Sequence, residues 1–184
     1  SQLTFSRQPV AGASGGELAT QPILRIEDAY GNLVDSSDTV LVTLHSGAQG
    51  LLSGTTSLAA SGGIVSFTDL GLTGRTGTDY VLRFTAGALT LDTAALRVSP
   101  GTASALVFGT QPSGSNTAGA AFATQPVINI VDAQGNVVTS ATDDITLALS
   151  SGSGTLSGTV TLAAVSGVAA FSDLLIETAG SGKV

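Results

Sequence analysis

The strongest constraint on this chain is an internal repeat with a spacing of 104 residues. Residues 19–34 match residues 123–138 at ten of sixteen positions, and residues 52–70 match residues 156–174 at eleven of nineteen. Self-similarity at one spacing indicates that a single structural unit is used twice. A unit of about 100 residues is long enough to bury a core of its own. We therefore expect two tandem domains.

The boundaries follow from where the second copy begins. Residues 1–99 form the first predicted domain, residues 100–105 the linker, and residues 106–184 the second domain. The linker is short and contains proline, which favours a semi-rigid connection over a loose one.

Apolar residues alternate with polar ones through both copies, which is the period of a half-buried strand. Predicted strands recur every eight to twelve residues, with Gly, Ser or Asp between them, and no segment shows helical periodicity. This pattern predicts an all-β fold of two Ig-like β-sandwiches. We also expect a strand at residues 32–34 and a short hairpin formed by residues 52–55 and 56–58. The inward face is predicted to include Val40, Val42 and Leu44.

One turn is common to the two copies and contains the best-matched residues. The sequence Asp-Ala-x-Gly-Asn predicts a type I turn in which Asp binds the turn backbone and Gly takes a positive φ. The predicted structural turn residues are Asp28, Gly31, Asn32, Asp132, Gly135 and Asn136.

The composition excludes several classes of function. Thirteen acidic against six scattered basic residues give a net charge of −7, which disfavours nucleic acid or an anionic membrane as partner. No cysteine is present, so disulfides and thiol chemistry are excluded. We find no apolar run long enough to span a membrane and no signal peptide, and we expect no membrane insertion. Cysteine-free, acidic chains rich in Ser, Thr and Gly are typical of bacterial surface proteins.

The second copy is expected to be incomplete at its C-terminal side. Val184 aligns with Tyr80, so counterparts of residues 81–100 are not in the sequence. A sandwich without its last two strands would expose its core and a bare sheet edge, which invites pairing with another chain. A truncated piece of a longer chain and a strand supplied by a neighbour are both compatible with this pattern.

The Asp-Ala-x-Gly-Asn turn resembles that of bacterial Ig-like domains of the invasin and intimin type. The segments Gly63–Phe67 and Gly167–Phe171 are similar to a later strand of those repeats. The resemblance implies a rod of stacked domains on a cell surface, in a secreted filament or in a phage particle. It implies no catalytic residues.

Two motifs that could indicate catalysis are better explained by structure. Residues 12–16 fit the G-x-S-x-G pattern of hydrolases, but that motif needs a strand-to-helix elbow and here lies between strands. His45, the single histidine, is predicted to face outward, with no serine or acid partner evident. We therefore expect no enzymatic activity and assign no catalytic residues.

Carboxylates in the turns raise the alternative of a calcium site, because Ca²⁺ takes six to eight oxygen ligands. No D-x-D-x-D-G loop occurs, and Asp is an ordinary turn residue, so we expect neither a metal nor a cofactor. Tyr30, at a turn tip, could stack on a sugar, but its counterpart is Gln134. The calcium candidates are Asp28, Asp35, Asp38, Asp132, Asp143 and Asp144.

Three functions remain open from the sequence. The first is a non-enzymatic spacer, stalk or adhesin rod of an extracellular bacterial surface protein. The second is a subunit of an extracellular filament or phage particle, in which a neighbour donates the missing strands. The third is a carbohydrate- or receptor-binding adhesin domain. Expected partners are neighbouring Ig-like repeats or copies of the chain itself, including a homopolymer, at a cell or virion surface.

Overall fold

The computed structural model describes residues 1–113, 117–152 and 154–177. The chain divides into two compact units, Ser1–Gly101 and Thr102–Val184, which are described separately. Every regular element of the described residues is a β-strand, and every pairing between these strands is antiparallel. The all-β prediction is therefore confirmed, while the finer Ig-like assignment and the domain boundaries stay predictions.

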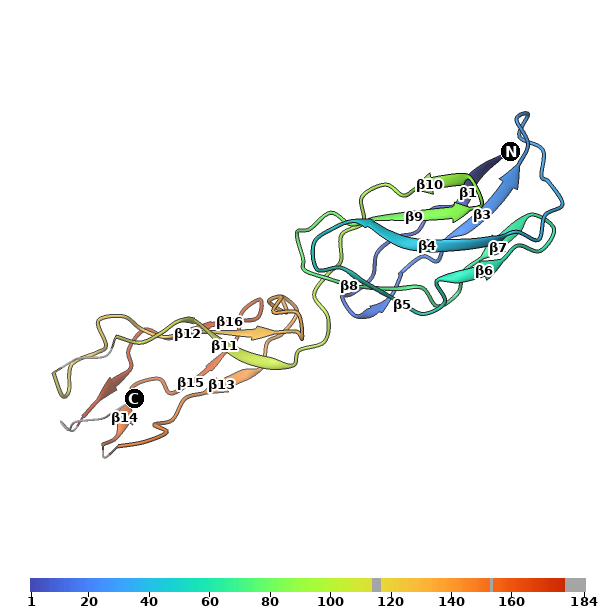
Figure 1. The fold of residues 1–184 in the computed structure, drawn as a ribbon. Coiled ribbons are helices and arrows are strands. Elements are labelled where there is room, and N and C mark those ends of the chain that lie inside the picture. Colours follow the sequence, from blue (N-terminus) through green and yellow to red (C-terminus); the bar gives the residue numbers. More distant parts are fainter. Residues whose placement is uncertain (114–116, 153, 178–184) are drawn as a thin grey trace. The chain divides into compact units, whose positions relative to one another are not determined.

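The first unit contains ten strands in three sheets (Figure 1). Their orders are β1-β3-β7, β10-β9-β4-β6 and β2-β8-β5. The strands are β1 (Gln2–Arg7), β2 (Gly16–Glu17), β3 (Ile23–Glu27), β4 (Thr39–Ser46), β5 (Leu51–Ser53), β6 (Ser57–Ala59), β7 (Ile64–Ser66), β8 (Gly71–Thr73), β9 (Val81–Ala86) and β10 (Leu89–Asp92).

The core of the first unit forms where the sheets containing β3 and β9 face each other. Alternate residues of β3, β4 and β9 point into it, as the period-2 pattern predicts. Phe84 of β9 is fully buried and meets the rings of Phe5 and Phe67 edge to face, at centroid distances of 5.5 and 5.7 Å. Such contacts between facing sheets are consistent with a β-sandwich.

The second unit repeats part of this arrangement. Its sheet β11-β12-β16 corresponds to β1-β3-β7, the pair β13-β15 to β4-β6, and the pair β14-β17 to β5-β8. The strands are β11 (Ala105–Thr110), β12 (Val127–Val131), β13 (Asp144–Thr146), β14 (Leu156–Ser157), β15 (Thr161–Ala163), β16 (Val168–Ala170) and β17 (Leu175–Ile176).

Two local expectations are wrong. Residues 52–58 do not form a hairpin, because β5 pairs with β8 while β6 pairs with β4 in another sheet. The residues between them therefore cross from one sheet to another. Residues 32–34 do not form a strand either: only an isolated bridge joins Leu33 to Glu27, because the turn brings the chain back for a single pair.

Candidate functional site

The glutamine of the repeated Ala-Thr-Gln-Pro segment ties two parts of each unit together. The Gln21 side-chain amide donates to the carbonyl oxygens of Leu18 and Leu70, at 3.4 and 2.9 Å, and its Oε1 accepts from Leu70 N at 3.0 Å. Gln125 makes the same three bonds to the carbonyl oxygens of Phe122 and Leu174 and to Leu174 N. Each glutamine thus binds the backbone of a leucine 49 positions further along the chain, and we call this set of contacts the glutamine clip.

An aspartate side chain also makes the same contacts in both units. In the first unit it binds the segment that crosses from β5 to β6. Asp69 accepts from Thr55 N at 3.0 Å and from Thr55 Oγ1 at 2.9 Å. Asp173 accepts from Thr159 at 3.0 and 2.8 Å through the same two atoms. This aspartate–threonine clip satisfies backbone donors that no strand partner reaches.

The predicted turn residues form a third recurring contact. One carboxylate oxygen of Asp28 accepts from the backbone nitrogens of Tyr30 and Asn32, and the other accepts from the Asn32 amide. Gly31 has a φ of 83°. Asp132, Gly135 (φ 78°) and Asn136 repeat the same bonds in the second unit.

The glutamine clip gives a direct stability test. Replacing Gln21 with leucine would leave three part-buried backbone groups without that side chain as partner. We expect the free energy of unfolding of the first unit to fall by about 1–3 kcal/mol. Chemical denaturation of the full chain measures this loss. The control is Gln8→Leu at an exposed position, where an effect equal to that of Gln21→Leu would contradict the role of the clip.

Acid should weaken these contacts. Hydrogen bonds from the Asn32 amide and backbone, and then from Tyr30 N, lower the pKa of Asp28. Bonds from Thr159 N and Oγ1 lower the pKa of Asp173. A carboxylate whose pKa is lowered by folding stabilises the folded state above its ordinary pKa, and this stabilisation is lost as pH falls through the lowered value.

We therefore expect the unfolding midpoint of the first unit to drop as pH falls below about 4. Asp28→Asn should make this dependence shallower. Denaturation curves between pH 2 and 6 test this, with Asp35→Asn as a control that removes an exposed carboxylate nearby. Equal slopes for the wild type and Asp28→Asn would refute the assignment.

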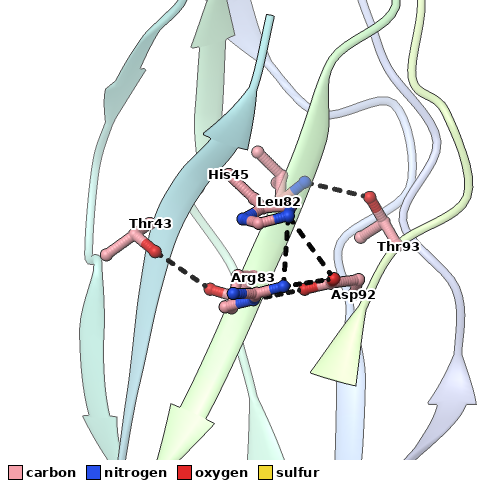
Figure 2. A network of polar contacts seen from close by, with 6 residues as sticks. All are labelled: Thr43, His45, Leu82, Arg83, Asp92 and Thr93. Atoms are coloured by element: carbon pink, nitrogen blue, oxygen red, sulfur yellow. Dashed lines mark hydrogen bonds and ion pairs between the residues drawn. The ribbon is translucent and has the colours of Figure 1, made fainter. Parts of the chain in front are cut away.

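His45 belongs to a polar network on the outward side of β4, β9 and β10 (Figure 2). Arg83 binds both carboxylate oxygens of Asp92, at 2.8 and 2.7 Å, and contacts His45 Nε2 at 3.1 Å. His45 Nε2 lies 3.9 Å from Asp92, so the expectation that no acid lies nearby is wrong. The aspartate comes from β10, on the far side of β9, which sequence alternation within β4 cannot show. The exposed ion pair joins neighbouring strands.

The remaining candidates do not come together as a site in the described residues. Ser14 of the G-x-S-x-G segment is buried, and its hydroxyl donates to Gly74 O and accepts from Gly74 N. No group of three or more acidic, histidine or cysteine side chains lies close enough to hold a metal ion in the described part of the chain. Asp35, Asp38, Asp143 and Asp144 are exposed, whereas Asp132 is buried.

Tyr30 lies at the tip of its turn with 92% of its surface exposed. Its backbone nitrogen donates to Asp28, so the turn fixes the backbone at this residue. Its counterpart Gln134 occupies the same place in the second turn and is only partly exposed. The two units therefore present different side chains at equivalent tips.

The second unit exposes apolar side chains where the first unit buries them. Leu106 and Phe108 of β11 are 57% and 48% exposed, whereas the corresponding Leu3 is 5% exposed and Phe5 packs against the core. In the first unit β10 contacts β1, and β9 covers the same side. We call the exposed residues of β11, together with the β13 edge that is unpaired among the described residues, the open side. Strands corresponding to β9 and β10 are not among the described residues of this unit.

Comparisons with known proteins give little beyond this. No protein-family model matches the chain, and no curated protein matches it. Among solved structures, the chain is similar to the surface layer protein SbsC, domains 4–9, with 16% sequence identity and a TM-score of 0.39. The similarity covers all of this chain and 27% of the SbsC chain. Within the described residues, no helix is long and apolar enough to cross a membrane.

Proposed function

We propose that this chain is a non-enzymatic structural module of an extracellular bacterial surface protein, in which tandem Ig-like sandwiches act as a spacer, stalk or adhesin rod. One observation carries the proposal: the side chains common to both units are those that hold the backbone. The glutamine clip, the aspartate–threonine clip and the Asp-Ala-x-Gly-Asn turn recur bond for bond.

Exposed side chains that could bind a ligand or take part in catalysis differ between the units, which supports the same proposal. Tyr30 is replaced by Gln134, and His45 aligns with Ser150 in the second copy. Duplication has kept the contacts that stabilise the fold and has not kept these groups. A repeated scaffold is what a spacer requires. The composition, which is cysteine-free, acidic and poor in charged residues, supports a surface location.

Force spectroscopy tests the spacer role. The full chain is held at both ends and stretched. Unfolding of the 101-residue first unit should appear as one event that releases roughly 330–360 Å of chain, less its folded length. The event should return after relaxation. Smooth extension without such an event would contradict a role in carrying mechanical force, and glycan binding that is lost in Tyr30→Ser would favour the adhesin alternative instead.

The open side favours a second candidate, a subunit of an extracellular filament or phage particle that receives strands from a neighbour. Unpaired edges and exposed apolar faces promote association between chains. Light scattering and electron microscopy of the chain at micromolar concentration test this candidate. Ordered oligomers are the expected result, and a monomer at every concentration would exclude self-assembly.

A further inference from the structure

We propose that residues 12–14, together with Ser99 and Gly74, form a latch that sets how strongly the first unit resists being stretched from its two ends. This inference rests on the proposed spacer function, because a latch of this kind matters in a module that carries mechanical force. It also gives a role to the G-x-S-x-G segment of residues 12–16, whose serine is buried.

A parallel contact joins the last residues of the first unit to the segment that follows β1. Ala13 and Ser99 form an isolated parallel bridge, in a unit whose strand pairs are antiparallel. Ser99 N donates to Gly12 O at 3.1 Å, and Ser99 O accepts from Ser14 N at 2.9 Å. Both backbone groups of Ser99 are therefore held by residues 12–14.

The direction of the two segments in this bridge decides how it carries force. The N-terminus lies at one end of the first unit, and the chain leaves the unit at the other end (Figure 1). A pull on both ends therefore reaches the bridge from the N-terminal side of Gly12 and from the C-terminal side of Ser99. In a parallel pair these are opposite ends of the contact. Sliding then strains both hydrogen bonds together, whereas a peeled hairpin opens its bonds one after another.

The serine side chain anchors this bridge to a sheet. The hydroxyl of Ser14 donates to Gly74 O at 2.7 Å and accepts from Gly74 N at 2.9 Å, directly after β8. Gly15 N also donates to Leu72 O of β8 at 3.2 Å. Ser14 is 7% exposed, and hydrogen bonds away from water are electrostatically stronger. Force that arrives at Ser99 is thus passed through Ser14 to the sheet β2-β8-β5.

The second unit repeats the turn of this segment but not the hydroxyl. Gly15 and Gly119 occupy equivalent positions and have φ values of 84° and 77°, which glycine adopts without strain. Ala118 stands where the first unit has Ser14. The turn therefore forms without a serine, and the serine is not needed to shape it. Its bonds to Gly74 are an addition of the first unit, to which the latch belongs.

The test stretches the full chain at constant force and compares variants of the latch. Ser99→Pro removes the N–H that binds Gly12 O, and Ser14→Ala removes the hydroxyl. We expect each variant to speed the unfolding of the first unit roughly threefold to tenfold, because it loses hydrogen bonds that oppose the unfolding step. The matched control is Thr102→Pro, at a residue whose N–H donates to no residue in the described part of the chain. It should unfold like the wild type.

The direction of pulling separates force transmission from general stability. The chain has no cysteine, so Ala88→Cys, in the exposed turn between β9 and β10, provides a single handle that precedes Ser99 in the sequence. Force applied between the N-terminus and residue 88 does not pass through Ser99. We therefore expect Ser99→Pro to lose most of its effect when the chain is pulled in this way.

Two results would overturn the latch. In the first, both latch variants unfold at the wild-type rate when pulled from the two ends. In the second, Ser99→Pro speeds unfolding equally in both pulling directions, or Thr102→Pro speeds it as much. Either result leaves the spacer proposal standing if the wild type still unfolds in one event, whereas the absence of that event in the wild type would refute both. Chemical denaturation verifies that each variant is folded before it is stretched, and either latch variant alone is sufficient for the test.

Discussion

Replacing Phe84 with alanine is expected to lower the free energy of unfolding of the first unit by about 3–5 kcal/mol. Phe84 is fully buried between the rings of Phe5 and Phe67, and alanine would leave a cavity among all three. The loss combines the burial of an aromatic ring with two edge-to-face contacts. Because natural domains are stable by only about 5–15 kcal/mol, this one change should remove a large part of the stability.

The measurement can be confined to the first unit. The chain has no tryptophan, and both of its tyrosines, Tyr30 and Tyr80, lie in residues 1–101. Tyr80 is fully buried, so tyrosine fluorescence during denaturation reports on this core alone. The control is Tyr30→Ala, which removes an aromatic ring that is 92% exposed and should change stability by less than about 0.5 kcal/mol. Similar losses in the two variants would mean that Phe84 is not central to the core.

Replacing Gly63 with alanine should cost at least about 2 kcal/mol. Gly63 has a φ of 77°, which disfavours any residue with a Cβ. A Cβ at this position would also overlap the carbonyl oxygen of Val34, which is backbone and cannot rotate away. The substitution would therefore disturb the hydrogen bonds that Gly63 makes to Ile26 N and to Ser36 O.

Gly62 supplies a matched control for this prediction. Its φ of 58° is also positive, but a Cβ there would meet no atom within 4 Å. We expect Gly62→Ala to cost about 1 kcal/mol, the cost of the backbone conformation alone. The second unit has a residue with a Cβ at the corresponding position, Ser166, at a φ of 52°, and it is followed by Gly167 at 78°. If Gly62→Ala were as destabilising as Gly63→Ala, the clash with Val34 would not be the cause.

The alternation of apolar residues predicted the sheet faces well because it depends on the chain's immediate neighbours. Val40 and Val42 are buried while Leu41 between them is 45% exposed. Leu82 and Phe84 are buried in the same manner on β9. When one face of a strand packs on a core, every second residue must be apolar. The strand's own sequence is therefore enough to predict which side chains point inward.

Strand partners could not be predicted in the same way. Residues 52–58 combine two short apolar runs with Gly54, which is also the signature of a hairpin. The two strands pair with β8 and β4 in different sheets, and Asp69 binds Thr55 at the crossing from fourteen residues away. A local turn signal does not report where such a distant side chain will lie, so the sequence predicts a hairpin where the chain crosses between two sheets.

The glutamine clip was missed although a signal for it was present. Gln21 and Gln125 recur inside an identical four-residue segment, and both bind the backbone 49 residues further along the chain. A polar side chain repeated next to buried strands indicates a buried hydrogen-bond role. Its partners, Leu70 and Leu174, are hydrophobic residues that take part through their backbone, and sequence patterns do not single out such atoms.

The pairing of β4 with β9 affects how the first unit folds during its synthesis. Thr43 pairs with Arg83, forty residues further along the chain. Phe5 contacts Phe84, which lies near the other end of the unit in sequence. During synthesis from the N-terminus, β1, β3 and β4 emerge with their apolar faces uncovered until β9 follows. Long-range pairing of this kind folds slowly and leaves the emerging chain prone to aggregation. Because only 10% of the residues are charged, electrostatic repulsion between emerging chains stays weak until the last strands arrive.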